Sequence, residues 1–164
     1  MLFRSAVTAA RAAQAGWAQA TAYNRGQILY RIAEMLEGRA EQFNQEITIA
    51  LGLTPAKAKA IVAQAIDRWV WYAGWSDKLS AIAGATNPVA GPYYNFTIPE
   101  PLGVVTIAAE DSFLDCIDAL AAAVVSGNSV VTLIGGGLSV PMATLAEVLA
   151  TSDLPAGVIN ILTG

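Results

Sequence analysis

The sequence predicts an α/β fold with parallel strands, and the evidence is the alternation of its last third. Apolar, β-branched runs predict strands at residues 103–108, 129–134 and 158–162, while 113–125 and 139–150 have helical patterns. Continuous apolar strands that alternate with helices are typical of parallel sheets with right-handed crossovers. Because a doubly wound domain needs more strands than these, we expect an incomplete Rossmann-like three-layer fold.

The first half of the chain predicts an α-helical N-terminal segment in front of this sheet. Alanine-rich residues 4–20 predict one helix, with Trp17 as its anchor, and apolar residues at helical spacing predict another over 25–43. Thr54-Pro55 combines a capping hydroxyl with a proline at the first helical position, which predicts a helix that runs to about Leu79. The apolar stripe of that helix comprises Ile61, Ala65, Trp69 and Tyr72.

Glycine and proline turns interrupt the helical pattern before an aromatic and β-branched run at residues 93–98, which predicts a strand. Residues 1–164 are therefore expected to form a single partial domain. It has a helical part (1–83), a turn-and-strand part (84–101) and a βαβαβ part (102–164).

The chain carries few charges: 13% of its residues are charged and 55% are hydrophobic. An average soluble domain has roughly 25% charged residues, so we expect much of the surface to be buried against a partner. All nine Lys and Arg residues lie within 1–78, and only acids follow. Nucleic acid binding needs a basic surface, which the second half cannot provide.

Composition also limits the cellular compartment and the kinds of catalytic or metal site that the chain can form. No uninterrupted run of about 20 apolar residues is present, so we expect no membrane span. A single cysteine fits a cytoplasmic setting. The absence of histidine excludes Ser-His triads and most zinc sites.

Three local features are candidates for chemistry, and each has a simpler explanation. Cys116 lies among acidic residues, which raise the pKa of a thiol, so we predict a buried or semi-buried structural cysteine. Gly135-Gly136-Gly137 could cradle a phosphate, but no cation follows it, and a strand-to-helix turn is favoured. Glu110, Asp111 and Asp115 could bind a hard cation, but a solvated helix N-terminus is favoured and no metal site is expected.

Four segments carry a resemblance to a known family: residues 25–29, 100–105, 127–131 and 154–164. In their order and spacing they resemble the N-terminal, cofactor-binding half of the aldehyde dehydrogenase superfamily. Residues 151–155 are most similar to the second, non-catalytic aldehyde-dehydrogenase-like domain of the two-domain family-16 enzymes. The resemblance implies a cofactor-binding fold and, for the family, NAD(P)-dependent dehydrogenase activity.

The sequence departs from the family where the family carries its chemistry. The family's Pro-Trp-Asn-Phe-Pro aligns with residues 110–114, so Ser112, flanked by carboxylates, replaces an asparagine that helps to stabilise an oxyanion. The family's Lys-Pro-Ser-Glu aligns with 133–136, so Leu133 and Gly136 replace the two side chains that hold the adenosine ribose. The family's nucleophilic cysteine and general-base glutamate fall after the last residue. We therefore expect no catalytic residue, only degenerate cofactor-binding positions (Ser112, Leu133, Gly136), and no bound cofactor.

Aromatic and apolar side chains are the candidates for a partner surface. The resemblance implies that the strand at 93–98 belongs to a projecting oligomerisation element. We expect a homo-oligomer, or a larger aldehyde-dehydrogenase-type subunit as partner. The interface candidates are Trp71, Trp75, Tyr93, Tyr94, Phe96 and Ile98.

These observations favour a catalytically inactive pseudoenzyme module that acts in assembly or scaffolding through protein–protein contacts. The alternative is one part of an NAD-dependent aldehyde dehydrogenase, an oxidoreductase with NAD as its cofactor, completed by another chain. A nucleotide-binding module without chemistry also stays open.

Overall fold

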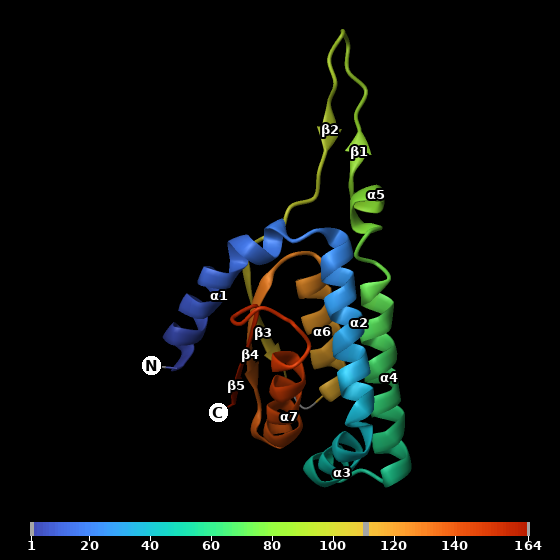
Figure 1. Ribbon diagram of the computed structural model, residues 1–164, viewed down its shortest axis with the longest axis vertical. Helices are drawn as coiled ribbons and strands as arrows, with labels where there is room; N and C mark the ends of the chain where they lie inside the picture. Colours follow the sequence, from blue (N-terminus) through green and yellow to red (C-terminus); the bar gives the residue numbers. More distant parts are fainter. Residues whose placement is uncertain (1, 110–111, 164) are drawn as a thin grey trace.

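The computed structural model describes residues 2–109 and 112–163, and it shows helices packed around a small parallel sheet (Figure 1). The strands are β3 (Val104–Ala109), β4 (Ser129–Ile134) and β5 (Ile159–Thr163), which lie in the order β3-β4-β5. Both neighbouring pairs are parallel. The predicted α/β fold with parallel strands after a helical segment is therefore confirmed.

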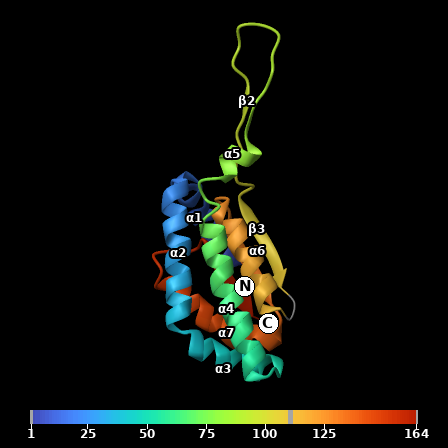
Figure 2. The ribbon, with the colours of Figure 1, turned by 90° about the vertical axis from the view of Figure 1, so that its right-hand side faces the viewer.

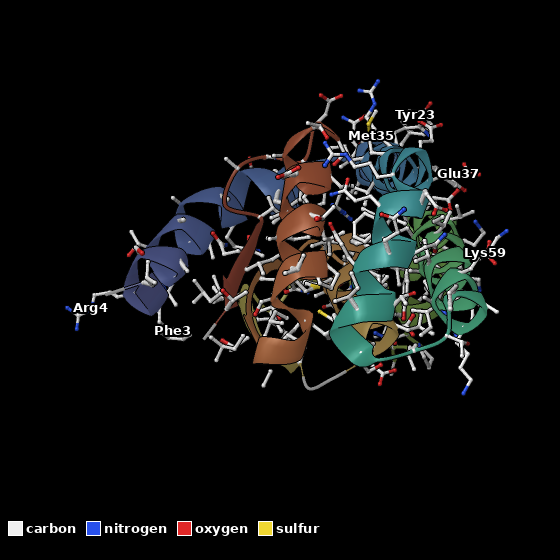
Figure 3. All side chains as sticks on the ribbon, turned by 90° about the horizontal axis from the view of Figure 1, so that it is seen from below. Phe3, Arg4, Tyr23, Met35, Glu37 and Lys59 are labelled. Carbon is white, nitrogen blue, oxygen red and sulfur yellow. The ribbon has the colours of Figure 1, made fainter. Side chains whose placement is uncertain are left out.

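Helices cover both faces of the sheet. The connecting helices α6 (Phe113–Val125) and α7 (Ser139–Ala150) pack on one face, and α1 (Leu2–Gln19) crosses the other. Outside α6 and α7 lies a further layer, visible in Figures 2 and 3. This outer layer consists of α2 (Ala22–Gly38), α3 (Ala40–Leu51) and α4 (Pro55–Ala73).

Local capping signals set the start of several helices. The Ser112 hydroxyl accepts a hydrogen bond from the Asp115 N–H at 3.2 Å and starts α6. Thr21 caps α2 and Thr54 caps α4 in the same way, each through its side-chain oxygen. Because these caps depend on neighbouring residues only, the sequence alone could predict the starts of α4 and α6.

Two predicted helices have different ends in the structure. The helix expected over 25–43 is divided at Arg39, which separates α2 from α3 and allows α3 to turn and pack on α7. The helix from Pro55 ends at Ala73, not near Leu79, because turns follow Gly74. The short helix α5 (Leu79–Ala83) comes after those turns.

The turn-and-strand part forms a hairpin that projects from the rest of the molecule (Figure 1). Its paired strands are only β1 (Ala85–Thr86) and β2 (Phe96–Thr97), which are antiparallel. The strand predicted over 93–98 is thus much shorter than expected, because it has a single short partner and no third strand to extend the ladder.

Helix α1 is tied to the sheet through its second half. The Gln14 side chain donates to the Gly127 carbonyl at 3.1 Å and accepts from the Ser129 N–H at 2.7 Å. The indole N–H of Trp17 donates to the Val124 carbonyl at 2.9 Å, which confirms Trp17 as the anchor. At the other end of the helix, the labelled side chains of Phe3 and Arg4 point away from the sheet in Figure 3.

Ion pairs join the two halves of the chain. Each of three long-range pairs places an arginine from the first half beside an acid from the second half. The pairs are Arg31–Asp153, Arg39–Glu147 (2.7 Å) and Arg68–Asp118 (3.5 Å). The uneven charge distribution of the sequence is therefore partly compensated between elements. None of the helices in the described ranges is both long and apolar enough to cross a membrane.

Candidate functional site

The carboxyl ends of β3, β4 and β5 form one edge of the sheet, because the strands are parallel. Open parallel sheets bind ligands outside this edge. The three positions singled out from the sequence as degenerate, Ser112, Leu133 and Gly136, all come at or just after the ends of β3 and β4. The structure therefore brings them to the same edge.

Ser112 lies beside an apolar cleft of about 740 Å³ at this edge. Leu51, Leu53, Ile61 and Phe113 contribute to its walls. Among the described lining residues, only Ser112 and Asp115 have polar side chains, and none is cationic. Because the Ser112 oxygen already accepts the capping hydrogen bond, it serves the helix start. Sequence reasoning missed this cleft, since its walls come from distant segments.

Leu133 is the exposed residue of an otherwise buried strand, with 41% of its surface accessible. Strand alternation places it on the face of Val131, which packs under α1. An apolar side chain therefore occupies the end of β4 where the resemblance implies a lysine.

The glycine run forms a turn into a short 3-10 helix, η1 (Gly136–Leu138), just before α7. A Cβ atom built on Gly136 meets no other atom within 4 Å. The fold would thus accept a larger side chain at this position, as it would at the exposed Leu133. The surrounding packing therefore does not require a glycine at position 136 or a leucine at position 133.

Of the three acids that the sequence places near the start of α6, the structure describes Asp115. Glu110 and Asp111 lie outside the described residues, so their predicted effect on an oxyanion stays a prediction. Asp115 is exposed in the first turn of α6, as expected for a solvated helix N-terminus. Within residues 2–109 and 112–163, no three potential metal-ligating side chains lie together.

Cys116 is buried in the core, as predicted. Burial raises the pKa of its thiol to about 11, and the Thr132 hydroxyl offsets a smaller part. The predicted direction of the pKa shift is confirmed, but its cause differs: loss of solvent dominates, not the acidic neighbours.

The interface candidates lie in two separate places, on α4 with the turn after it and on the hairpin. Trp71 lies on the outer surface of α4, 5.4 Å from the half-buried Trp75 between ring centres, whereas Trp69 is fully buried. The hairpin carries the other candidates, all exposed: Tyr93, Tyr94, Phe96 and Ile98. Sequence reasoning did not single out the exposed apolar residues Val70, Ile82 and Leu102. Their exposure can be recognised only in the structure, where other side chains do not cover them.

Comparisons with known proteins agree with this architecture. The sequence profile described as "Aldehyde dehydrogenase family" matches residues 2–164. The alpha-ketoglutaric semialdehyde dehydrogenase of Bacillus subtilis is 35% identical over 97% of this chain and 33% of its own length. The 2,5-dioxopentanoate dehydrogenase of Saccharolobus solfataricus is 32% identical over 90% of this chain and 31% of its own length.

Solved structures give the same result for the fold. A putative aldehyde dehydrogenase from Burkholderia cenocepacia superposes with a TM-score of 0.95 at 31% identity, covering 99% of this chain and 34% of its own. The NAD+ complex of an aldehyde dehydrogenase from Bacillus cereus superposes with a TM-score of 0.92 at 27% identity, covering 98% of this chain and 33% of its own.

The sheet and its helices define a Rossmann-like α/β class of protein. Because the family profile covers nearly the whole sequence, the chain belongs to the aldehyde dehydrogenase family. It spans about a third of the length of the relatives named above. The family resemblance is thereby confirmed, while the finer likeness to the second domain of family-16 enzymes stays a prediction.

Proposed function

We propose that this chain is a catalytically inactive, aldehyde-dehydrogenase-like module that acts in assembly or scaffolding through protein–protein contacts. The observation that carries the proposal is the pair Leu133 and Gly136 at the carboxyl edge. Both positions have room for a larger side chain, yet neither offers a polar one. These two positions therefore differ from the family pattern in the polar groups that they lack, and not because space is missing for a larger side chain.

Charge supports the same proposal. A dinucleotide brings two negative phosphates, which proteins bind with cationic side chains or with backbone N–H groups. From Leu79 to Gly164 the sequence contains no lysine or arginine. Any dinucleotide at this edge would depend on backbone groups or on cations from elsewhere, so we expect no bound cofactor for the chain alone.

The partner proposed here is another copy of the chain or a larger aldehyde-dehydrogenase-type subunit. The projecting hairpin and the Trp71 surface of α4 supply exposed apolar groups for such contacts. We further propose a cytoplasmic setting, which the single, buried thiol supports.

Calorimetric titration with NAD and NADP tests the proposal. We expect no saturable binding tighter than roughly 0.1 mM, which corresponds to about −5.5 kcal/mol. The double substitution Leu133→Lys with Gly136→Glu should tighten binding measurably, because it restores both ribose contacts that the family resemblance implies. A matched control, Ile82→Lys, adds a cation to the exposed surface of α5 and should leave binding unchanged. Tight binding by the unmodified chain would contradict the proposal.

The second candidate is one part of an NAD-dependent aldehyde dehydrogenase completed by another chain, with NAD as cofactor. The observation in its favour is the TM-score of 0.92 with the NAD+ complex from Bacillus cereus. The test mixes the purified chain with candidate partner subunits, an aldehyde and NAD, and follows NADH formation. Activity that depends on Ser112 or Cys116 of this chain would favour this second function over the first.

A further inference from the structure

Helix α1 has a positively charged outer side. Arg4 and Arg11 are both exposed, and they lie about two helical turns apart, so they share one side of the helix. Ala6 and Ala10 lie on the other side, where they are buried in a cluster with Val131 of the sheet. The two arginines therefore face away from the core.

The neighbouring elements carry no charge that balances these two arginines. Helix α1 itself contains no acid, and neither do the three strands on which it packs. In the described parts of the chain, the ion pairs use other cations, namely Arg31, Arg39, Arg68 and Lys78. The negative charge beside Arg4 and Arg11 therefore comes from solvent ions or from an anionic partner.

Apolar side chains are exposed at the start of the same helix. Leu2 is 73% exposed and Phe3 is 48% exposed. Figure 3 shows the labelled side chains of Phe3 and Arg4 at this end of α1, pointing away from the sheet. Hydrocarbon and positive charge thus lie next to each other, and we call Leu2, Phe3, Arg4 and Arg11 together the α1 surface.

An apolar cleft of about 860 Å³ adjoins the α1 surface. Arg4 is the only ionisable group among its described lining residues, which are Leu2, Arg4, Ser5, Thr8, Ala9 and Ala12. The Ser5 hydroxyl donates to the Leu2 carbonyl at 2.8 Å, and the Thr8 hydroxyl donates to the Arg4 carbonyl at 3.0 Å. Because both hydroxyls already have partners, the cleft offers apolar walls and one guanidinium group. This combination suits an amphiphile with an anionic head group.

The exposed apolar groups decide between the possible anionic partners. Nucleic acid would neutralise the two arginines, but its phosphates offer no hydrocarbon to Leu2 and Phe3. Contact of these side chains with an acidic protein surface would desolvate carboxylates. A bilayer with anionic lipids supplies both groups: phosphates for the guanidinium groups and an acyl-chain boundary for the apolar side chains.

We propose that the α1 surface attaches this chain to an anionic membrane. The start of α1 tilts toward the bilayer, so that Leu2 and Phe3 enter the boundary between head groups and acyl chains, and Arg4 and Arg11 bind phosphates. The helix lies on the membrane without crossing it, since none of the described helices is long and apolar enough to span. Each cation near an anionic surface strengthens attachment about fivefold, so two of them give a weak, reversible contact. This inference goes beyond the assembly function and does not depend on it.

Sedimentation of the full chain with sucrose-loaded vesicles tests this inference. Vesicles made from an equimolar mixture of phosphatidylserine and phosphatidylcholine should bind the chain, and pure phosphatidylcholine vesicles should bind it about 25-fold less. High salt should release the chain from the anionic vesicles, because it screens exposed charges.

Substitutions on the α1 surface separate its two contributions. Arg4→Gln combined with Arg11→Gln should weaken binding to the anionic vesicles about 25-fold. Phe3→Ser keeps the net charge and should weaken binding roughly tenfold, because it removes the largest apolar group from the contact. The matched control is Lys57→Gln with Lys59→Gln, which removes the same charge from the exposed start of α4 and should bind like the unmodified chain. Circular dichroism checks folding, which we expect to persist because the substituted residues lie outside both buried clusters.

Several results would overturn the inference. They are absence of binding to the anionic vesicles, equal binding to neutral vesicles, and an equal loss of binding in the arginine and lysine variants. Unchanged binding of Phe3→Ser, or stronger retention on duplex DNA than on the vesicles at the same salt, would assign the arginines to a purely electrostatic partner. A chain that binds the vesicles but stays monomeric and binds no dehydrogenase subunit would support the membrane contact and contradict only the assembly function.

Discussion

Single residues show how packing determines the chemistry of this chain. Cys116 lies on α6 against β4, and its thiol has no access to solvent. A thiol acts as a nucleophile only when it ionises, and the raised pKa of Cys116 keeps it protonated near neutral pH. The sequence could predict this burial from the apolar pattern of α6, but not the Thr132 hydroxyl beside the thiol, because that contact joins separate elements.

The Cys116 thiol predicts a dependence of stability on alkaline pH. Its pKa is about 11 in the folded protein and 9.0 for an ordinary thiol, so the unfolded chain loses the proton first as the pH rises. Stability from the neutral buried thiol is therefore complete below pH 9 and is lost between pH 9 and 11, by roughly 2–3 kcal/mol at most. Urea unfolding across this range should show a steeper decline for the unmodified chain than for Cys116→Ala. Parallel curves would refute the prediction.

Among the helices and strands, the ends that local sequence signals mark could be predicted, and the ends that depend on distant contacts could not. The ranges expected for α6, β4 and α7 are correct because capping residues, glycines and apolar runs mark both ends of each. The break at Arg39 has only a weak local signal, Gly38, because apolar residues continue at helical spacing on both sides of it. It exists because α3 packs on α7, about a hundred residues further along the chain, and no local pattern records that contact.

The crossing of α2 and α4 depends on a glycine. A Cβ atom on Gly26 would lie 2.5 Å from the Ser76 hydroxyl oxygen and 3.2 Å from the Ala73 carbonyl oxygen. Gly26→Ala should therefore force the helices apart and reduce the free energy of unfolding by roughly 1–3 kcal/mol. Gly16→Ala is the matched control, because a Cβ there meets nothing within 4 Å. It should stabilise α1 by up to about 1 kcal/mol. Denaturant unfolding of both variants measures the difference, and equal effects would show that the close approach is relieved at no cost.

For the whole molecule, the sequence could predict the layers better than the surfaces. The alternation of apolar strands with helices predicts a parallel sheet, and the rule of right-handed crossovers gives the hand of its connections. The pattern did not give the spatial order of the strands. The apolar cleft beside Ser112 was not accessible from the pattern either, because α3, α4, α6 and the turn after β4 meet there only in three dimensions. The exposure of Leu133 was likewise hidden, since a leucine in a largely apolar strand is expected to be buried.

The hairpin should be separable from the body of the molecule. Thr86 and Phe96 lie directly opposite each other, so a two-residue Asn-Gly turn can join them in place of residues 87–95. We expect the free energy of unfolding to change by less than about 0.5 kcal/mol, because the core takes no residue from this segment. Thermal and denaturant unfolding of the shortened chain measure this directly. A loss of several kcal/mol would mean that the hairpin supports the core.

The contact between α1 and the turn before β5 has a consequence for synthesis. The backbone of Ala9 approaches Gly157 so closely that a Cβ on Gly157 would lie 2.7 Å from the Ala9 carbonyl oxygen. The first helix therefore docks on a turn that the ribosome makes almost 150 residues later. At roughly 5–20 residues per second, the wait is about 7 to 30 seconds. Until then the apolar side of α1 lacks part of its native neighbours, so we expect the nascent chain to be a substrate for chaperones.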